Sequence, residues 1–296
     1  MKKKGSVVQL DRISDFGSEG WGFESSLGHL LLLFFFITKL NSQTIIFETE
    51  LPISVNETSG LEIINNNLVT LNDSRNQPNL YYLSKNGEIF FVRSFDELQN
   101  NDWEDITADN EFIYIADIGN NYDTRSDLNI IKVPINIQNK SVEIINFYYP
   151  EQDDFSFKQN SYYDAESLIS YENNLLIFTK NRAKQITEIY RVPKVPGNYK
   201  ADLIGSIDVK SVVTAADFDN KKKLLVLTST HDFNEYSIIK IKDFNISKIN
   251  NLKFKKHKIP LAKTQVEAIK IINKNNFWIT SEAELFGKPK LYKISL

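Results

Sequence analysis

The chain has 296 residues, of which 42% are hydrophobic and 25% are charged, as in a soluble globular protein with a sizeable core. Its net charge of −3 gives no basic field for nucleic acid, so no nucleic-acid partner is expected. The chain has no cysteine, which excludes disulfides, thiol catalysis and cysteine-ligated metals.

The segment before residue 43 is predicted to lie outside the fold. Residues 30–37 (LLLLFFFI) are an apolar run of eight residues, far short of the ~20 that a membrane-spanning helix needs, so no membrane span is expected. Small and polar residues follow up to Ser42, as in the h-region and cleavage zone of a secretory signal peptide. Residues 30–42 therefore predict an exported protein, periplasmic or at the cell surface, although a buried strand or helix is an alternative.

Residues 1–29 are polar and without periodicity. Gly22–Ser25 (GFES) back-translates to a sequence like the T-arm of a transfer-RNA gene, and Ser14–Glu19 (SDFGSE) contains the two complementary arms of an anticodon-like hairpin. We interpret residues 1–29 as a non-native extension of translated, transfer-RNA-like sequence, with the native start near Leu30. Met1 is the only methionine, so that start requires another codon or another frame.

From residue 43 onward, short strands rich in Ile, Val, Leu, Phe and Tyr alternate with Asn, Asp, Gly and Pro clusters, and one pattern recurs five times. An acidic or small polar residue begins a first strand, at 56–63, 102–106, 164–169, 215–218 and 265–269. A tight Asn- or Lys-rich turn leads to a second strand, at 67–71, 111–116, 175–179, 224–228 and 276–280. Third strands are expected at 80–83, 128–133, 188–192, 236–241 and 291–294.

Fourth strands are expected in four of the five units, at 88–92, 142–149, 201–207 and 252–258. The last unit lacks one, and the strand 44–49 (TIIFET) has no partner of its own. Placing this strand in the last unit closes a ring without a free edge. The sequence thus predicts an all-β, five-bladed β-propeller over residues 43–296. The alternative is a six-bladed ring with a degenerate blade in the insertion 151–161.

In a propeller the first strand of each blade lines a central channel. The loop before that strand and the loop between second and third strands lie on one face of the ring. The predicted ligand-binding residues on this face are Glu57, Asp73, Glu104, Asp105, Asp117, Glu166, Lys180, Asp217, Glu267 and Glu282. We expect Lys180 to pair with Glu166.

Three interpretations of this acidic face stay open. It can bind a cation, since Ca²⁺ takes six to eight hard oxygen ligands, although no metal-ligand set is assigned. It can hold a general acid and base for hydrolysis of glycosidic or ester bonds, with candidates Glu104, Glu166, Asp217 and Glu267. It can be structural, with carboxylates accepting backbone N–H groups of the next blade. The first hypothesis is a monomeric, non-enzymatic module for a cation, carbohydrate, small ligand or protein segment; the second is a hydrolase.

Several motifs together resemble a known family: E-x-S-G-L at 57–61, NDS at 72–74, DWEDI at 102–106, ADIGNN at 116–121, DAE at 164–166 and QVEAI at 265–269. They are similar to those of secreted bacterial propellers described as NHL- or WD40-like, which often carry a sorting domain of the type IX secretion system. The resemblance implies a propeller outside the cytoplasm and no particular activity. This chain ends at its last blade, which favours the periplasm.

Overall fold

Five β-sheets make up the part of the chain that the computed structural model describes, residues 43–231, 235–261, 264–283 and 287–296. These residues belong to one unit, Ser42–Leu296. The predicted extension and export signal, residues 1–42, lie outside the described residues. Among those residues, the helices are the short 3₁₀ segments η2 (Ile53–Val55) and η3 (Ile246–Asn251), and no helix has the length and apolarity to cross a bilayer.

Each sheet contains one blade, and in the first four blades the four blade strands follow chain order from the inside to the outside. The first blade contains β2 (Thr58–Ile64), β3 (Asn67–Asn72), β4 (Asn79–Leu83) and β5 (Ile89–Ser94). The second contains β6 (Trp103–Ala108), β7 (Phe112–Asp117), β8 (Asn129–Pro134) and β9 (Glu143–Tyr148). The third contains β10 (Ala165–Tyr171), β11 (Asn174–Thr179), β12 (Thr187–Pro193) and β14 (Asp202–Ile207).

The fourth blade contains β15 (Val212–Asp219), β16 (Leu224–His231), β17 (Glu235–Ile241) and β18 (Phe254–Lys258). The fifth contains β19 (Val266–Ile271), β20 (Asn276–Ser281), β21 (Lys290–Ser295) and, as its outer strand, β1 (Thr44–Glu50). β1 runs antiparallel to β21, from Thr44 opposite Ser295 to Glu50 opposite Lys290. The predicted closure of the last blade by the N-terminal strand is confirmed.

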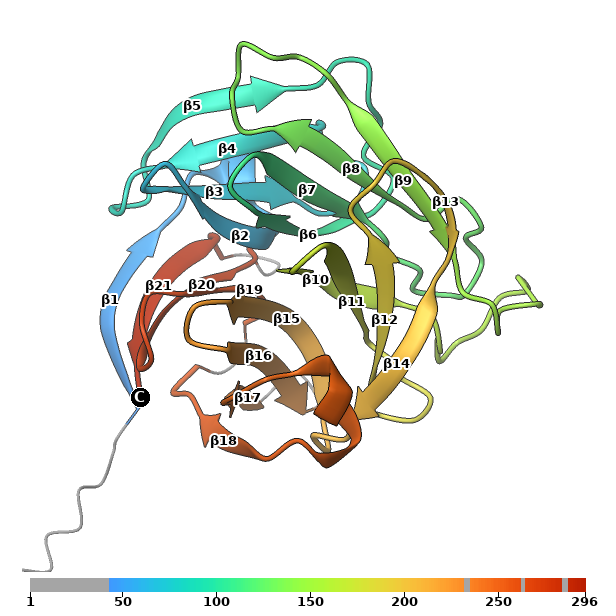
Figure 1. The fold of residues 1–296 in the computed structure, drawn as a ribbon. Helices are drawn as coiled ribbons and strands as arrows, with labels where there is room; N and C mark the ends of the chain where they lie inside the picture. Colours follow the sequence, from blue (N-terminus) through green and yellow to red (C-terminus); the bar gives the residue numbers. More distant parts are fainter. Residues whose placement is uncertain (1–42, 232–234, 262–263, 284–286) are drawn as a thin grey trace, which may run out of the picture. The chain divides into compact units, whose positions relative to one another are not determined.

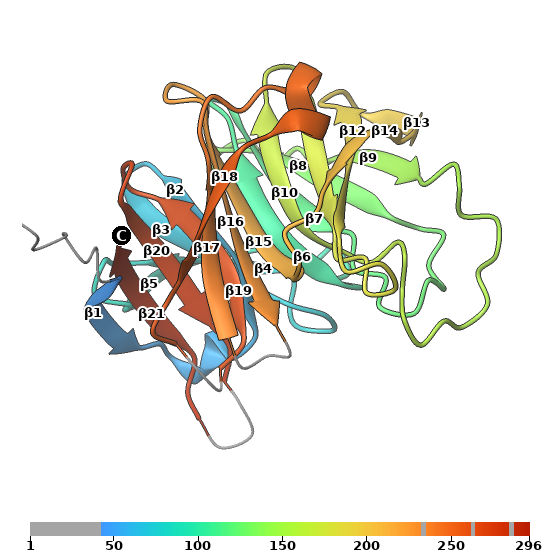
Figure 2. The same cartoon turned by 90° about the horizontal axis from the view of Figure 1, so that it is seen from below.

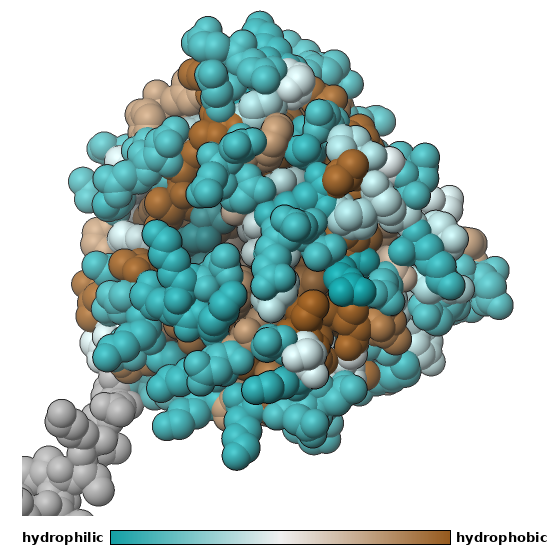
Figure 3. Space-filling model, in the orientation of Figure 1, coloured by the Kyte–Doolittle hydropathy of each residue, from teal (hydrophilic) through white to brown (hydrophobic). Residues whose placement is uncertain are grey.

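The inner strands contact one another in a closed cycle, β2, β6, β10, β15, β19 and back to β2, so the five blades form a propeller (Figure 1). The predicted five-bladed fold is confirmed and the six-bladed alternative is wrong, because the insertion 151–161 forms no strand. Figure 2 shows the blades side by side from below, and Figure 3 shows that the face seen in Figure 1 is largely hydrophilic.

The core lies between the blades, because both faces of every sheet are covered by a neighbour. One apolar cluster fills each of the five spaces between adjacent blades. Trp103, for example, is fully buried against Val69 and Leu80 of the first blade. Strands buried on both faces read as nearly continuous apolar runs, such as NLLIFT in β11.

One strand is absent from the sequence prediction. β13 (Gly197–Lys200) leaves the third blade and pairs in parallel with β9 of the second, from Gly197 opposite Ile145 to Lys200 opposite Tyr148. Its sequence GNYK has no alternation of apolar residues, so only the tertiary pairing defines it.

Candidate functional site

Every inner strand carries one extra residue relative to its neighbour. The pairing register skips this residue, which is Ser59, Glu104, Glu166, Thr214 or Glu267 in the five blades in order. Such β-bulges turn a side chain in a new direction and are frequent beside functional sites. The propeller therefore repeats one bulge five times at the same end of its channel, and three of the five bulged residues are glutamates.

The bulges align the five inner strands differently from the acidic residues that define the sequence repeats. The sequence repeats group Glu57 and Asp217 with Glu104, but Glu57 lies two residues before its bulge and Asp217 three residues after. The bulged residues of those blades are Ser59 and Thr214, which a search for carboxylates does not find. The register is set by hydrogen bonds between strands, so composition does not reveal it.

At the bulged end lies a cavity of about 240 Å³ with an entirely polar wall. It contains six of the ten predicted ligand-binding residues, namely Asp73, Glu104, Glu166, Lys180, Glu267 and Glu282. The other described lining residues are Ser59, Asn121, Arg182 and Gln265. The cavity thus combines inner strands of four blades with the loops that follow β3, β7, β11 and β20.

Two predicted residues instead fasten one blade to the next. The backbone N–H groups of Ile106 and Leu168 donate to the two carboxylate oxygens of Asp105, at 2.7 and 2.8 Å. The Ile271 N–H (2.7 Å) and the Lys270 ammonium (2.8 Å) donate to Asp217. This is the structural role that the sequence analysis left open, and Asp217 lies outside the polar cavity.

Asp117 and Glu57 also lie outside the cavity wall, where each holds a neighbour. The Arg125 guanidinium pairs with Asp117 Oδ1 at 2.9 Å, and the Asp102 N–H donates to the same oxygen at 3.1 Å. The Asn76 side chain donates to the Glu57 carboxylate.

Sequence reasoning missed Asp102 and Asp164 as site residues. Asp102 precedes the bulged Glu104 by two residues and Asp164 precedes the bulged Glu166 by the same step, so both belong to an acid-x-Glu pattern. Glu57 has the same offset from Ser59. This spacing was the available signal, since it repeats at the start of three inner strands.

The carboxylates form two groups that share Glu104. Oxygen atoms of Asp73, Asp102 and Glu104 lie within 4.8 Å of one another, and so do those of Glu104, Asp164 and Glu166. Burial, and then the Asp102 carboxylate, raises the pKa of Asp73 to about 8. Burial, and then Glu166, raises the pKa of Asp164 to about 7.

Lys180 and Arg182 form ion pairs with the second group, Glu166 and Asp164. Lys180 is buried with its Nζ 2.8 Å from Glu166 Oε1, as predicted from the sequence. The Arg182 Nη2 lies 3.1 Å from Asp164 Oδ2, and its Nη1 donates to Asn121 Oδ1 at 2.8 Å. Both ion pairs join residues of the third blade.

Glu104, the residue common to both groups, is left without compensation. Its side chain is 5% exposed and makes no hydrogen bond or ion pair with any residue that the structure describes. Burial raises the pKa of Glu104 well above its ordinary value, and the carboxylates of Glu166, Asp73, Asp102 and Asp164 raise it further. A second oxygen in the cavity, Glu267 Oε2, is buried and lacks a hydrogen-bond partner among the same residues.

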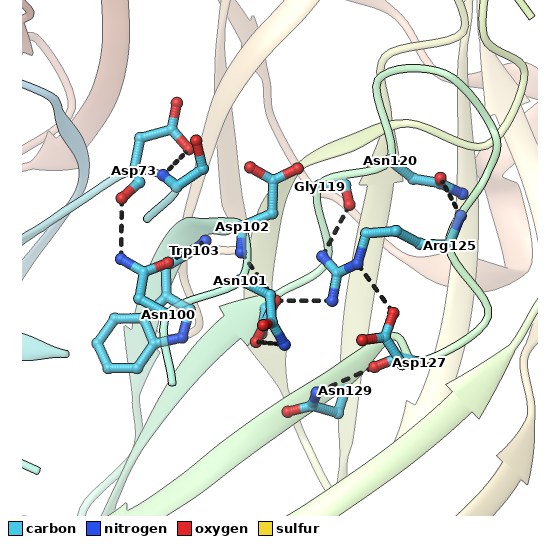
Figure 4. A network of polar contacts seen from close by, with 12 residues as sticks. Asp73, Asn100, Asn101, Asp102, Trp103, Gly119, Asn120, Arg125, Asp127 and Asn129 are labelled. Atoms are coloured by element: carbon cyan, nitrogen blue, oxygen red, sulfur yellow. Dashed lines mark hydrogen bonds and ion pairs between the residues drawn. The ribbon is translucent and has the colours of Figure 1, made fainter. Parts of the chain in front are cut away.

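A network of amides and one arginine fixes the Asp73–Asp102 side of the cavity (Figure 4). The Asn100 side chain donates to the Asp73 carbonyl at 2.8 Å and accepts the Trp103 N–H at 3.0 Å. The Arg125 Nη1 donates to the Gly119 carbonyl at 2.8 Å. A Cβ added at Gly119 would overlap the carboxylates of Glu104 and Asp102, so the cavity needs glycine here.

No family model matches the chain, and no curated protein matches it. Among solved structures, a glucose dehydrogenase is similar with a TM-score of 0.48 and 6% identity, over 84% of this chain and 99% of its own. Regucalcin from Agrobacterium tumefaciens, described as a calcium-binding protein, has a TM-score of 0.42 and 11% identity, over 85% and 94%. The WD40 repeats of RRP9 have a TM-score of 0.41 and 8% identity, over 80% and 67%. At such identities the likeness does not extend to ligand or activity.

Proposed function

We propose that this propeller is a binding module that holds a divalent cation, with Ca²⁺ the best fit, at the bulged end of its channel. The main support is Glu104. Its buried carboxylate lies near four other carboxylates and has no hydrogen-bond or ion-pair partner among the described residues. Buried charges are paired or coordinate metals, because an isolated one is costly. A bound cation supplies the charge that this arrangement lacks.

The donor set supports a hard cation. Carboxylates, amides and a hydroxyl line the cavity, and its described wall has neither histidine nor cysteine. Such oxygen donors suit Ca²⁺ and Mg²⁺ and are poor for zinc or copper. Ca²⁺ tolerates irregular arrangements of six to eight oxygens, which fits a wall drawn from several blades better than the strict octahedron of Mg²⁺.

The Asp73–Asp102–Glu104 group is the best place for the ion. Its three carboxylates have oxygens within 4.8 Å of one another, and the cations Lys180 and Arg182 lie instead against Glu166 and Asp164. Coulomb attraction between a divalent cation and three close carboxylates is stronger in a partly buried site than in bulk water. Glu104 can reach this ion as the ligand shared with the second group.

Calorimetric titration of the metal-free protein with CaCl₂ tests this function. We expect Ca²⁺ binding and a rise in the melting temperature that EDTA reverses, because a ligand that binds only the folded state stabilises it. Glu104→Gln keeps the shape of the side chain and should weaken binding at least about tenfold, which is ~1.4 kcal/mol. Glu235→Gln, an exposed carboxylate paired with Lys258 on the fourth blade, is the matched control and should bind like the wild type. A wild-type protein that ignores millimolar Ca²⁺ contradicts the proposal.

Hydrolysis is a second candidate function, favoured by the contrast between Glu104 and Glu166. Burial raises the pKa of Glu104, as a general acid requires, while Glu166 is ion-paired to Lys180. Paired carboxylates of this kind cleave glycosidic bonds. Assays with nitrophenyl glycosides and esters test it: activity that disappears in both Glu104→Gln and Glu166→Gln supports the enzyme, and inactivity on every substrate removes it.

A further inference from the structure

One loop within the second blade and the loop that connects the second blade to the third join into one projecting lobe (Figures 1 and 2). They are residues 118–128, between β7 and β8, and residues 149–164, between β9 and β10. The buried Asp123 connects them, because its carboxylate accepts the backbone N–H groups of Tyr162 (2.8 Å) and Tyr163 (2.9 Å). The Gln152 side chain donates to the Asp123 carbonyl at 2.7 Å, so the connection has three hydrogen bonds.

The lobe exposes aromatic rings. Tyr122 is 51% exposed and Phe157 is 66% exposed, and the two rings stack with centroids 4.7 Å apart and planes 21° apart. The Lys158 N–H donates to the Tyr122 carbonyl at 3.0 Å, which fixes the two loops beside the stack. Phe155 and Tyr162 are also exposed on the lobe. We call Tyr122, Phe155, Phe157 and Tyr162 the aromatic ledge.

The fold does not need this ledge. The insertion forms no strand, and Tyr122 and Phe157 belong to none of the five core clusters. Exposing large apolar rings in water is unfavourable, and contiguous exposed apolar surface marks binding sites. The hydrogen bonds through Asp123 hold the ledge in one arrangement, which lowers the entropy lost when a ligand binds.

Residues next to the ledge in the chain belong to the wall of the polar cavity or contact it. Tyr122 follows Asn121, which lines the cavity, and Asn121 accepts a hydrogen bond from Arg182 of the same wall. On the other loop, the N–H groups of Arg182 (3.0 Å) and Ala183 (3.3 Å) donate to the Ser161 carbonyl, next to Tyr162. A ligand that leaves the cavity past Asn121 and Arg182 therefore meets aromatic rings.

We propose that the ligand of this site is an oligosaccharide, with hydroxyl groups at the cation and a sugar ring on the Tyr122–Phe157 stack. This proposal rests on the proposed cation site. Aromatic faces carry negative charge, which attracts the C–H groups on the apolar face of a sugar ring. Vicinal hydroxyls supply oxygen ligands to Ca²⁺ and accept or donate hydrogen bonds with the carboxylates, amides and hydroxyl of the cavity wall.

A peptide fits these surfaces less well. Protein partners anchor apolar and aromatic side chains in well-packed pockets. The described wall of the polar cavity has no apolar residue, and the segment that carries Phe155 and Phe157 also contains Asp153 and Asp154. A ligand rich in hydroxyls that also has flat apolar faces suits both surfaces.

A glycan array of neutral and acidic oligosaccharides tests the proposal with the full chain, in CaCl₂ and in EDTA. We expect Ca²⁺-dependent binding to one class of oligosaccharide, followed by calorimetry with the best-bound member. Phe157→Ala and Tyr122→Ala should each weaken that binding about tenfold, since a ring contact contributes on this scale. Phe90→Ala on β5, which removes a similarly exposed ring (56%) from the outer strand of the first blade, is the control and should bind like the wild type.

Separate titration with CaCl₂ alone distinguishes failure of this inference from failure of the cation site. Phe157→Ala should keep the Ca²⁺ affinity of the wild type, because the ring supplies no ligand oxygen. If the wild type binds Ca²⁺ but no oligosaccharide, or if Phe157→Ala binds the oligosaccharide unchanged, the inference is overturned and the cation site stands. If the wild type binds no Ca²⁺, the cation site and the inference built on it both fall.

Discussion

Glu104 and Glu166 are bulged residues of neighbouring blades, yet only Glu166 has a cation of its own, the Lys180 ammonium at 2.8 Å. Glu104 lies among the same carboxylates but has no hydrogen-bond or ion-pair partner among the described residues. The cations of the protein therefore neutralise only part of the negative charge at the bulged end of the channel.

Lys180→Met should destabilise the metal-free protein by about 3 kcal/mol, because it removes the nearer cation of the buried Glu166 carboxylate and leaves Arg182 Nη2, at 3.8 Å, as its remaining ion pair. Chemical denaturation measures the free energy of unfolding. Lys258→Met removes an ion pair whose side chains are 65% and 60% exposed, and it should leave the free energy of unfolding nearly unchanged. Equal losses in the two variants would show that the Lys180 pair contributes no more than a surface contact.

Gly119→Ala should weaken Ca²⁺ binding while the protein stays folded. The added methyl overlaps the carboxylates of Glu104 and Asp102, so these ligands must move apart. Calorimetric titration gives the affinity and circular dichroism checks the fold. An unchanged affinity would place the ion elsewhere than beside Gly119.

Asp217→Asn should lower stability and leave Ca²⁺ affinity unchanged. Asp217 accepts the Ile271 N–H and pairs with Lys270, which also pairs with Glu62 at 2.5 Å. The substitution weakens this buried contact between the fourth and fifth blades and removes nothing from the polar cavity. Melting temperature and calorimetry in parallel report both effects, and a variant that melts normally but loses Ca²⁺ would reverse the assignment.

Stability of the metal-free protein should decrease as pH rises. Burial, with the neighbouring carboxylates, raises the pKa of Asp73 to about 8 and the pKa of Asp164 to about 7 in the folded state. A carboxyl whose pKa is raised by folding contributes stability that is present below its unfolded pKa and lost as pH rises through the folded pKa. Unfolding free energy should fall by about 2 kcal/mol or more from about pH 5 to about pH 8.

Saturating Ca²⁺ should flatten or reverse this slope, because the ion favours the ionised carboxylates. Asp73→Asn should flatten it without Ca²⁺. A metal-free wild type that becomes more stable over this pH range would contradict the raised pKa of these groups.

The export prediction has a direct test at the N-terminus. If residues 30–42 are a signal region, the mature protein in its native host should begin at Gln43 and be found outside the cytoplasm. Mass spectrometry of the N-terminal peptide after cell fractionation measures both. A cytoplasmic protein that retains residues 1–42 would remove the prediction.

The sequence predicted the blades well because each strand carries its own signal. Ile, Val, Leu and Phe runs bounded by Asn-rich turns need no long-range information, and Asn65 and Asn66 adopt the positive φ values, 49° and 67°, that the tight turn requires. β13 carries no such signal. Its place beside β9 depends on a parallel pairing between two blades.

The site was less predictable because residues next to each other in the sequence have different structural roles. Glu104 and Asp105 are adjacent carboxylates, yet one lines the cavity and the other fastens β6 to β10. The bulge that separates them is a feature of register, which appears only when both strands are in place. In addition, two of the five bulged residues are Ser59 and Thr214, so a search for repeated carboxylates does not find the bulge in every blade.

The pairing of β1 with β21 also has a consequence for how the protein is made. The first strand of the propeller leaves the ribosome early but finds its partner only when residues 290–295 have followed. The ring therefore closes only after β21 has been synthesised, and until then β1 has no partner strand.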